Sequence, residues 1–407
     1  MRILHTSDWH FGRSLHGVDL HEAVDLFTRW LIDCVKERDV DVVLISGDIF
    51  DRALPPVSSV RQLSYVLEEL CRLCTVILTP GNHDSATRLG FVSQLLSPRL
   101  RIVSDIHLIG QAIDINATDG SGVLIYPIPY LEPDLVRTAL RDSDSNEPIG
   151  RSHEAVIQAA VKRIRHDLAR RRLEGDDRPA VCMVHAFIVG GNASDSERDI
   201  HVGGVDSIPA SIFDLTVSPE NDPNAPIVTH GFDYIAAGHL HRPQNIHGAS
   251  VPIRYSGSPL AYSFSEAGTA KSVTLIECDA HQIRHIEILD VPVYRPLAVI
   301  TDSMDELLCG TYEDMRQHWL SINVTDSSRP SEMVPRLREY FPYALVIMHT
   351  PEHVPDAQIA RTHDIRTHSV HQILHAFFTD VGGASLTAHE SAALNDVVAD
   401  LRIKEQQ

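Results

Sequence analysis

Short apolar runs rich in Val, Ile and Leu recur along the first 260 residues, and each ends at a polar or glycine-containing cluster. Continuous apolar runs of this length are typical of strands that are buried on both faces of a sheet. The runs and the clusters that follow them are Arg2–Thr6 before Ser7–His10, Asp41–Ile45 before Ser46–Asp51, Thr75–Leu78 before Pro80–Asp84, Ala180–Val184 before His185, Tyr234–Ala237 before Gly238–His241, and Ile253–Tyr255 before Ser256–Pro259.

Two segments between these runs have the spacing of amphipathic helices. The apolar residues that share a helical face are Val24, Phe27, Leu31, Cys34 and Val35 in the first segment, and Leu63, Val66, Leu67 and Leu70 in the second. Alternating strands and helices predict a layered α/β domain, in which ligands bind outside the carboxyl ends of the strands. Because the polar clusters occupy those ends, the sequence predicts one active site assembled from several strands.

The repeated pattern of an apolar run followed by a polar cluster ends at about residue 290. We expect a smaller α+β unit there, with a last helix opened by the Thr387–Glu390 capping box and carrying one apolar stripe. The expected elements are strands at Val291–Ile300, Trp319–Val324 and Tyr343–Met348, a helix near Ser331–Tyr340, and the stripe of Leu394, Val397, Val398 and Leu401.

Composition excludes several classes of protein. With 43% hydrophobic and 22% charged residues, the 407-residue chain has an ordinary globular balance and is not disordered throughout. The 35 basic and 55 acidic residues give a net charge of −20, so bulk charge cannot hold nucleic acid, and any such contact needs local basic patches, metals or a partner. The six scattered cysteines and the lack of a long apolar run predict a cytoplasmic protein with free thiols and no membrane span.

Seven side chains in the polar clusters form a candidate ligand set without thiolates. They are Asp8, His10, Asp48, Asn82, His185, His239 and His241. Mixed carboxylate, amide and imidazole ligands suit divalent Mn, Fe or Zn. Seven ligands exceed the needs of one ion but suit two ions that share Asp48. Such a pair generates a nucleophile and holds phosphoryl oxygens, and His83, next to Asn82, is expected to act as general acid or transition-state donor.

In this order, the motifs Asp-x-His, Gly-Asp-x-x-Asp, Gly-Asn-His-Asp, a strand-borne His and Gly-His-x-His resemble those of the calcineurin-like metallophosphoesterase superfamily. Further segments are similar to its branch of SbcD-type DNA nuclease subunits: His5–Gly12, Arg198–Ile200 through Ile208–Ala210, Gly238–Gln244 and Tyr255–Pro259. The resemblance implies a two-sheet α/β sandwich flanked by helices, with a smaller α+β capping domain and a C-terminal helical tail. The implied bounds are 1–285 for the nuclease domain, 286–382 for the capping and DNA-recognition domain, and 383–407 for the tail.

The resemblance also distributes the ligands between two metal ions, with manganese as the expected metal. One ion is implied on Asp8, His10, Asp48 and His241, and the other on Asp48, Asn82, His185 and His239. His83 is implied to be the catalytic histidine. Asp51 stands where archaeal relatives carry a histidine, and we assign it, as a hypothesis, the role of orienting His83.

The activity implied by the resemblance is two-metal hydrolysis of DNA phosphodiesters, as a 3′–5′ exonuclease on duplex ends and an endonuclease on hairpins or single strands, in recombination, repair and replication. Implied partners are an SbcC-type coiled-coil ATPase and a second copy of the chain, within a nucleoid-associated heterotetramer. The first alternative is a metallophosphatase or nucleotide phosphodiesterase with a small substrate. The second is a non-catalytic scaffold, against which the intact ligand set argues.

Four weaker patterns each permit two interpretations. The basic segment Lys162–Arg172 either follows phosphates or is a solvated helix face. The Leu63–Leu70 face either forms a dimer or packs in the core. The terminal stripe either docks the ATPase or folds back on the chain. Six histidines between His349 and His375 have an open role, and we do not expect a second metal site there.

Overall fold

The computed structural model describes residues 1–91, 93–95, 97–117, 121–141, 147–197, 207–216, 226, 228–351, 387, 390, 391 and 394. The chain divides into two compact units, one of residues 1–299 with 317–319 and one of residues 300–316 with 320–407. The functional division expected at residues 285 and 382 remains a prediction. Residue 285 itself lies inside strand β16 (Ile283–Asp290) of the first unit.

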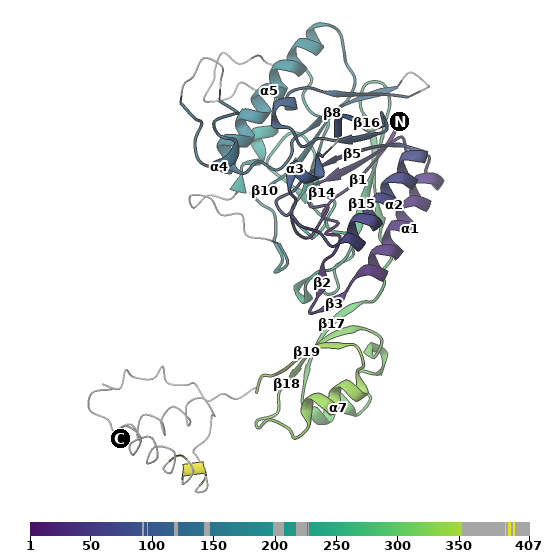
Figure 1. Ribbon diagram of the computed structural model, residues 1–407, viewed down its shortest axis with the longest axis vertical. Coiled ribbons are helices and arrows are strands. Elements are labelled where there is room, and N and C mark those ends of the chain that lie inside the picture. Colours follow the sequence, from purple (N-terminus) through teal and green to yellow (C-terminus); the bar gives the residue numbers. More distant parts are fainter. Residues whose placement is uncertain are drawn as a thin grey trace, which may run out of the picture. The chain divides into compact units, whose positions relative to one another are not determined.

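The first unit contains two six-stranded sheets (Figure 1). In the first sheet, β1, β4, β5 and β6 are parallel neighbours, whereas β15 is antiparallel to both β1 and β16. The strand order is β16, β15 (Ser272–Cys278), β1 (Arg2–Thr6), β4 (Val42–Ser46), β5 (Thr75–Thr79) and β6 (Leu100–Ile102).

The second sheet has four parallel inner strands and one antiparallel strand at each edge. Its order is β13 (Gln244–Ile246), β14 (Ile253–Tyr255), β12 (Tyr234–Gly238), β9 (Ala180–His185), β8 (Gly122–Pro127) and β7 (Ile113–Asn116). The two sheets pack face to face over one apolar core. Fully buried members of that core include Ile3, Val42, Leu44 and Ile77 of the first sheet and Val123, Ile125, Val181 and Met183 of the second.

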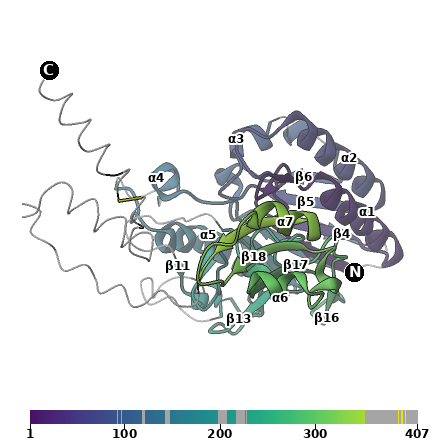
Figure 2. The same ribbon diagram turned by 90° about the horizontal axis from the view of Figure 1, so that it is seen from below.

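Helices cover the outer faces of the two sheets, which explains why the central strands are apolar on both faces. Helices α1 (His21–Glu37) and α2 (Val57–Leu73) lie side by side on the first sheet, and α5 (His153–Leu173) lies on the second (Figures 1 and 2). Helix α5 begins at Ser152, whose side chain accepts a hydrogen bond from the Ala155 amide at 3.2 Å. The predicted layered α/β fold is therefore confirmed, and it is a sandwich of two sheets.

The apolar stripes predicted on α1 and α2 are buried. On α2 the exposed fractions are 6% for Leu63, 0% for Val66, 8% for Leu67 and 0% for Leu70. This face packs in the core of the first unit, so the interpretation of Leu63–Leu70 as a dimer face is wrong.

Short elements complete the described part of the first unit. They are β2 (Ser14–Leu15), β3 (Val18–Asp19), α3 (Ala86–Leu89), α4 (Pro133–Val136), β10 (Phe187–Ile188), β11 (Ser207–Ile208) and four 3₁₀ helices at 93–95, 106–108, 210–213 and 264–266. In the whole described part of the chain, no helix has the length and apolar character needed to span a membrane.

The second unit is built on a three-stranded sheet with the order β17 (Leu297–Asp302), β18 (Trp319–Val324) and β19 (Ala344–His349). The first residues of β17 and β18, up to Val299 and Trp319, are counted with the first unit. It also contains α6 (Met304–Leu308) and α7 (Met333–Tyr340). The predicted α+β character is confirmed, but the first strand begins six residues later than expected. Helix α6, which opens at Ser303 as N-cap, was not predicted from the sequence.

The predicted capping box near the C-terminus is present. The Thr387 amide donates to the Glu390 carboxylate at 2.8 Å, and the Glu390 amide donates back to Thr387 Oγ1 at 3.3 Å. Of the apolar stripe, only Leu394 is among the described residues. Val397, Val398, Leu401, the histidines after His349 and the Arg198–Ile200 segment lie outside them.

Candidate metal centre

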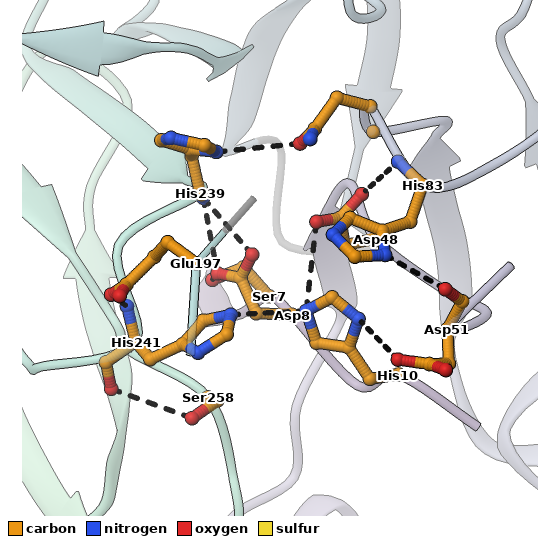
Figure 3. A network of polar contacts seen from close by, with 12 residues as sticks. Ser7, Asp8, His10, Asp48, Asp51, His83, Glu197, His239, His241 and Ser258 are labelled. Atoms are coloured by element: carbon orange, nitrogen blue, oxygen red, sulfur yellow. Dashed lines mark hydrogen bonds and ion pairs between the residues drawn. The ribbon is translucent and has the colours of Figure 1, made fainter. Parts of the chain in front are cut away.

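All seven predicted ligands lie at or just beyond the carboxyl ends of strands. Asp8 and His10 follow β1, Asp48 follows β4, Asn82 follows β5, His185 is the last residue of β9, and His239 and His241 follow β12. Because the parallel strands of each sheet end at one edge, and the two sheets are packed face to face, these side chains converge. Figure 3 shows this for Asp8, His10, Asp48, His239 and His241.

One half of the cluster is formed by His10, His241, Asp8 and Asp48. Nε2 of His10 lies 3.0 Å from Nε2 of His241 and 3.5 Å from Oδ2 of Asp48. Asp8, His10 and His241 each offer a ligand atom, and these atoms lie within 4.8 Å of one another. Two ligands at right angles on one ion, each bound at ~2.1 Å, are about 3 Å apart. The spacing of the two imidazoles therefore fits a shared cation.

The other half of the cluster is formed around Asn82. Its Oδ1 lies 2.9 Å from Nε2 of His185 and 3.3 Å from Nδ1 of His239. Asp48 Oδ2 lies 3.5 Å from His185 Nε2, the same distance that separates it from His10 Nε2. Asp48 therefore lies equally close to a histidine of each half.

The two buried carboxylates, Asp8 and Asp48, need a nearby positive charge to be stable in their ionised form. Burial raises the pKa of Asp8 to about 7, although Ser7 and the His239 amide donate hydrogen bonds to it. Burial also acts against ionisation of Asp48, yet His185 and His10 hold its pKa well below the ordinary value. In return, although burial lowers it, the neighbouring Asp48 raises the pKa of His185 to about 9. A bound divalent cation would supply the positive charge that protons on Asp8 and His185 supply in its absence.

The other three imidazoles are held neutral. Burial lowers the pKa of His239 to about 3 and places the pKa values of His10 and His241 well below the ordinary value. A neutral imidazole keeps a lone pair on one ring nitrogen, which is the form that binds metals. The donor set therefore fits two divalent ions.

Backbone strain is concentrated on the same residues. Among the described residues, seven non-glycine residues have positive φ, and four are proposed ligands: Asp8 (55°), His10 (46°), Asp48 (50°) and His239 (114°). Each such conformation costs on the order of 1–3 kcal/mol and persists only where its surroundings impose it. Here main-chain hydrogen bonds impose it, because the Asp8 and His10 amides donate to Gly47 O (3.1 Å) and Asp48 O (3.0 Å).

Glycine allows two close approaches at the site, one between the two sheets and one between neighbouring loops of the first sheet. A Cβ atom at Gly238 would overlap the main-chain oxygen of Ser46, and one at Gly81 would overlap Asp48. The glycines before His239 and Asn82 therefore belong to their motifs because no side chain fits there.

His83 is oriented by the main chain of Asp51. A carbonyl oxygen only accepts, so His83 Nδ1 donates to Asp51 O at 2.7 Å. The carboxylate of Asp51, which was expected to orient His83, instead lies 4.0 Å from His10 Nδ1 and 3.6 Å from Arg13 Nη1 (Figure 3). The residue contacts His83 as expected, but through its backbone.

Several residues of the site were given no role from the sequence. Asp84 was visible in the Gly-Asn-His-Asp motif. Its carboxylate accepts from the amides of Ile49, Phe50 and Gly81, each at 2.9 Å, and burial raises its pKa to about 7. It thereby joins the Asp48 loop to the Asn82 loop. Contacts to His241 from the loop that contains Ser196 had no sequence signal, because nothing in that polar stretch predicts what it faces.

Most arginines of the basic helix α5 contact acceptors inside the first unit. Arg165 and Arg172 are buried and donate to main-chain oxygens. Further contacts join Arg163 to Ala139 O, Arg170 to Asp167 and Glu174, and Arg171 to Asp167 and Asp114. These contacts do not favour the interpretation of Lys162–Arg172 as a phosphate-binding segment.

Comparison with known proteins agrees with this geometry. The model of the calcineurin-like phosphoesterase family matches residues 1–243, and the chain belongs to that family. Among curated proteins, the chain is 31% identical to the D component of the nuclease SbcCD of Escherichia coli over 335 residues, which cover 80% of this chain and 78% of the relative. It is 36% identical to the protein of the same name in Bacillus subtilis over 288 residues, covering 68% and 66%.

A solved structure of a dimetal phosphatase from Danio rerio aligns with 72% of this chain and 98% of its own, with 11% identity and a TM-score of 0.38, too low to add to the assignment. Family membership and the Asp/His cluster make this a site for two divalent metal ions.

Proposed function

We propose that this chain is the nuclease subunit of an SbcCD-type complex and hydrolyses phosphodiester bonds of DNA. The observation that carries the proposal is the meeting of two carboxylates, one amide and four imidazoles at the adjoining edges of two sheets. Similarity to the SbcCD nuclease components of two bacteria supports DNA as the substrate and an SbcC-type ATPase as the partner. The alternative of a phosphatase for small substrates is not favoured by these relatives.

In the proposed site, one ion is held by Asp8, His10, Asp48 and His241, and the other by Asp48, Asn82, His185 and His239. The ions supply an activated water and charge stabilisation for in-line attack on phosphorus. Ligands of oxygen and imidazole nitrogen suit Mn, Fe or Zn, and manganese is the proposed metal because of the resemblance to SbcD-type nucleases.

His83 is the proposed general acid. Its Nδ1–H is bound to Asp51 O, so the second proton of the imidazolium sits on Nε2. That proton passes to the leaving oxygen as its P–O bond breaks, while the attacking water releases one proton to solvent and forms the new P–O bond. Asp84 and Asp48 position His83, because Asp84 accepts from the Gly81 amide and Asp48 Oδ1 accepts from the His83 amide at 2.9 Å.

The remaining parts of the proposal concern substrates and assembly. We infer 3′–5′ exonuclease action on duplex ends and endonuclease action on hairpins or single strands, in recombination, repair and replication at the nucleoid. Residues 286–382 would recognise DNA, and residues 383–407 would bind the coiled-coil ATPase. For the proposed homodimer, the outward side of α2 offers Val57, Val60 and Tyr65, which are 68%, 46% and 56% exposed.

Part of the DNA affinity is assigned to the ATPase partner. The net charge of −20 opposes nonspecific attraction to phosphates, and the arginines of α5 already have partners within the chain. The isolated chain should therefore bind duplex DNA weakly, and its affinity should rise when the partner is added.

The test is cleavage of a blocked-end hairpin duplex with Mn²⁺ or Mg²⁺, for wild type and His83→Ala, with and without the ATPase. We expect Mn²⁺-dependent opening of the hairpin by wild type and a large loss in the variant. Hydrolysis of a chromogenic phosphomonoester without any cleavage of DNA would instead establish the small-substrate alternative.

A further inference from the structure

Behind His241, on the side away from the other ligands, lies a row of three buried polar side chains. His241 Nδ1 is 2.6 Å from Ser196 Oγ, and Ser196 Oγ is 2.7 Å from Glu266 Oε1. The other carboxylate oxygen of Glu266 forms an ion pair with Lys271. Ser196, Glu266 and Lys271 are 6%, 1% and 5% exposed, so water does not compete for these contacts.

The chemistry of the row fixes the direction of each hydrogen bond. Glu266 also takes a hydrogen bond from the Tyr262 amide at 3.1 Å, and its carboxylate, paired with Lys271, acts as acceptor throughout. Ser196 Oγ also lies 2.9 Å from Ser194 Oγ, but the carboxylate is the nearer and stronger acceptor, so the single hydroxyl proton of Ser196 goes to Glu266. Since Ser196 Oγ can then only accept from the imidazole, His241 carries its proton on Nδ1. Its Nε2 lone pair faces His10, inside the proposed metal site.

The same cluster also holds the main chain of His241. Its amide donates to Glu197 Oε1 at 2.7 Å, and its carbonyl oxygen accepts from Lys271 Nζ at 2.8 Å (Figure 3 shows Glu197 beside His241). His241 is thus fixed at its ring, its N–H and its C=O by residues from two separate loops.

This arrangement differs from that of the other imidazole whose rear nitrogen has a defined partner. His185 Nδ1 faces the main-chain oxygen of Ser46 at 2.9 Å, a contact that no side-chain substitution removes. His241 depends on a serine hydroxyl and, through it, on a buried ion pair. Burying an ion pair costs free energy, and here the hydrogen bonds from Ser196 and from the Tyr262 amide to Glu266 offset part of that cost.

We propose that Ser196 and Glu266 are positioning residues for His241 and set the affinity of the ion that His241 holds. The inference rests on the proposed metal centre and assigns new residues to it. Partners that orient a metal-binding histidine typically contribute 10–100-fold to metal affinity. The effect should be confined to one of the two ions, because Ser196 contacts the ring of His241, whereas Asn82 is the residue that contacts the rings of His185 and His239.

The experiment measures Mn²⁺ binding to the full chain by titration calorimetry and by the electron paramagnetic resonance signal of bound Mn²⁺. Wild type should bind two ions as a spin-coupled pair. Ser196→Ala should bind one ion with wild-type affinity and the second 10–100-fold more weakly, so that isolated Mn²⁺ appears at intermediate concentrations. Ser196→Thr keeps the hydroxyl and should restore the wild-type titration.

Glu266→Gln should resemble Ser196→Ala in its Mn²⁺ titration. If Glu266→Gln does not fold because Lys271 loses its partner, the comparison of Ser196→Ala with Ser196→Thr still tests the proposal. Glu287→Gln, which removes the exposed ion pair with Arg38, is the matched control and should leave Mn²⁺ binding unchanged. Unfolding midpoints in EDTA separate a structural effect from a positioning effect, since only the latter changes metal affinity.

Two tight ions in both wild type and Ser196→Ala would overturn this inference and leave the proposed function intact. A wild type that binds no ion would instead remove the proposed function itself. Parallel weakening of both ions in Ser196→Ala would also overturn the inference, because it would indicate a general loss of structure rather than a specific effect on His241.

Discussion

Nδ1 of His83 donates a 2.7 Å hydrogen bond to the main-chain oxygen of Asp51, whose own carboxylate lies against His10 and Arg13. The orientation of the proposed general acid therefore depends on the path of the Asp51 backbone. Substituting the carboxylate does not remove the acceptor of this hydrogen bond.

The first prediction follows from that contact. Asp51→Asn keeps the backbone acceptor and should lower Mn²⁺-dependent hairpin cleavage less than about tenfold. His83→Ala removes the proposed proton donor and should lower it by roughly 10²–10⁴-fold, the usual contribution of general acid catalysis. Initial rates at saturating Mn²⁺ for the two variants provide the comparison. Equal losses in both would mean that the Asp51 carboxylate takes part in the chemistry.

The second prediction concerns the close contact between sheets at Gly238. A methyl group there would overlap Ser46 O, which is main chain and cannot move aside, so Gly238→Ala should destabilise the first unit by about 3 kcal/mol. Gly231→Ala is the matched control, because its Cβ would meet Leu215 at an ordinary 3.5 Å. Urea unfolding in EDTA measures both variants without a contribution from metal. A Gly238→Ala protein as stable as the control would show that the sheets can separate at this point without cost.

Much of the site could be predicted because its ligands follow strands with a strong hydrophobic signal. Asp8, Asp48 and Asn82 come directly after buried strands of one sheet, so their order along the chain maps onto neighbouring positions in space. The prediction for α2 was ambiguous for the opposite reason. Its apolar face would look the same in a core and in a dimer, and only its packing decides between them.

The orientation of individual groups could not be predicted. Whether Asp51 holds His83 by its carboxylate or its carbonyl depends on backbone geometry within a tight loop, which residue types do not encode. Ser196, Glu266 and Lys271 are brought together from separate segments of the chain, and each is unremarkable where it stands in the sequence. The start of β17 at Leu297 was misplaced because Val291, Val293 and Tyr294 precede the strand and extend its apolar pattern towards the N-terminus.

The third prediction concerns stability at acidic pH. His5 is fully buried, its Nδ1 lies 3.1 Å from the Tyr234 hydroxyl, and burial lowers its pKa to about 3. As the pH falls through 6.5, His5 is therefore protonated in the unfolded chain but stays neutral in the folded chain. The folded chain keeps its full free energy of unfolding with respect to His5 above pH 6.5 and loses part of it progressively as the pH falls towards 3. At about pH 5 the loss amounts to about 2 kcal/mol relative to neutral pH.

His5→Asn tests this contribution, since an amide can keep the contact with Tyr234 but does not titrate. Free energies of unfolding in EDTA, at about pH 7 and about pH 5, should fall about 2 kcal/mol less for the variant than for wild type. The metal ligands titrate equally in both proteins, so the difference isolates His5. Identical losses in the two proteins would refute a neutral, buried His5.

The fourth prediction distinguishes the shared carboxylate from the ligands of a single ion. Asp48 Oδ2 lies 3.5 Å from both His10 and His185, whereas the ring of His239 contacts Asn82. Asp48→Asn should therefore weaken both ions, and His239→Ala should leave one Mn²⁺ bound per chain. At a free Mn²⁺ concentration about 100 times the dissociation constant, one bound ion stabilises the folded chain by about 2.7 kcal/mol. Mn²⁺ should therefore still raise the melting temperature of His239→Ala, but hardly that of Asp48→Asn. Metal content after gel filtration, together with melting curves with and without Mn²⁺, gives both readouts. If Asp48→Asn retained one tight ion, Asp48 would belong to a single metal site, and the two halves of the cluster would bind their ions independently.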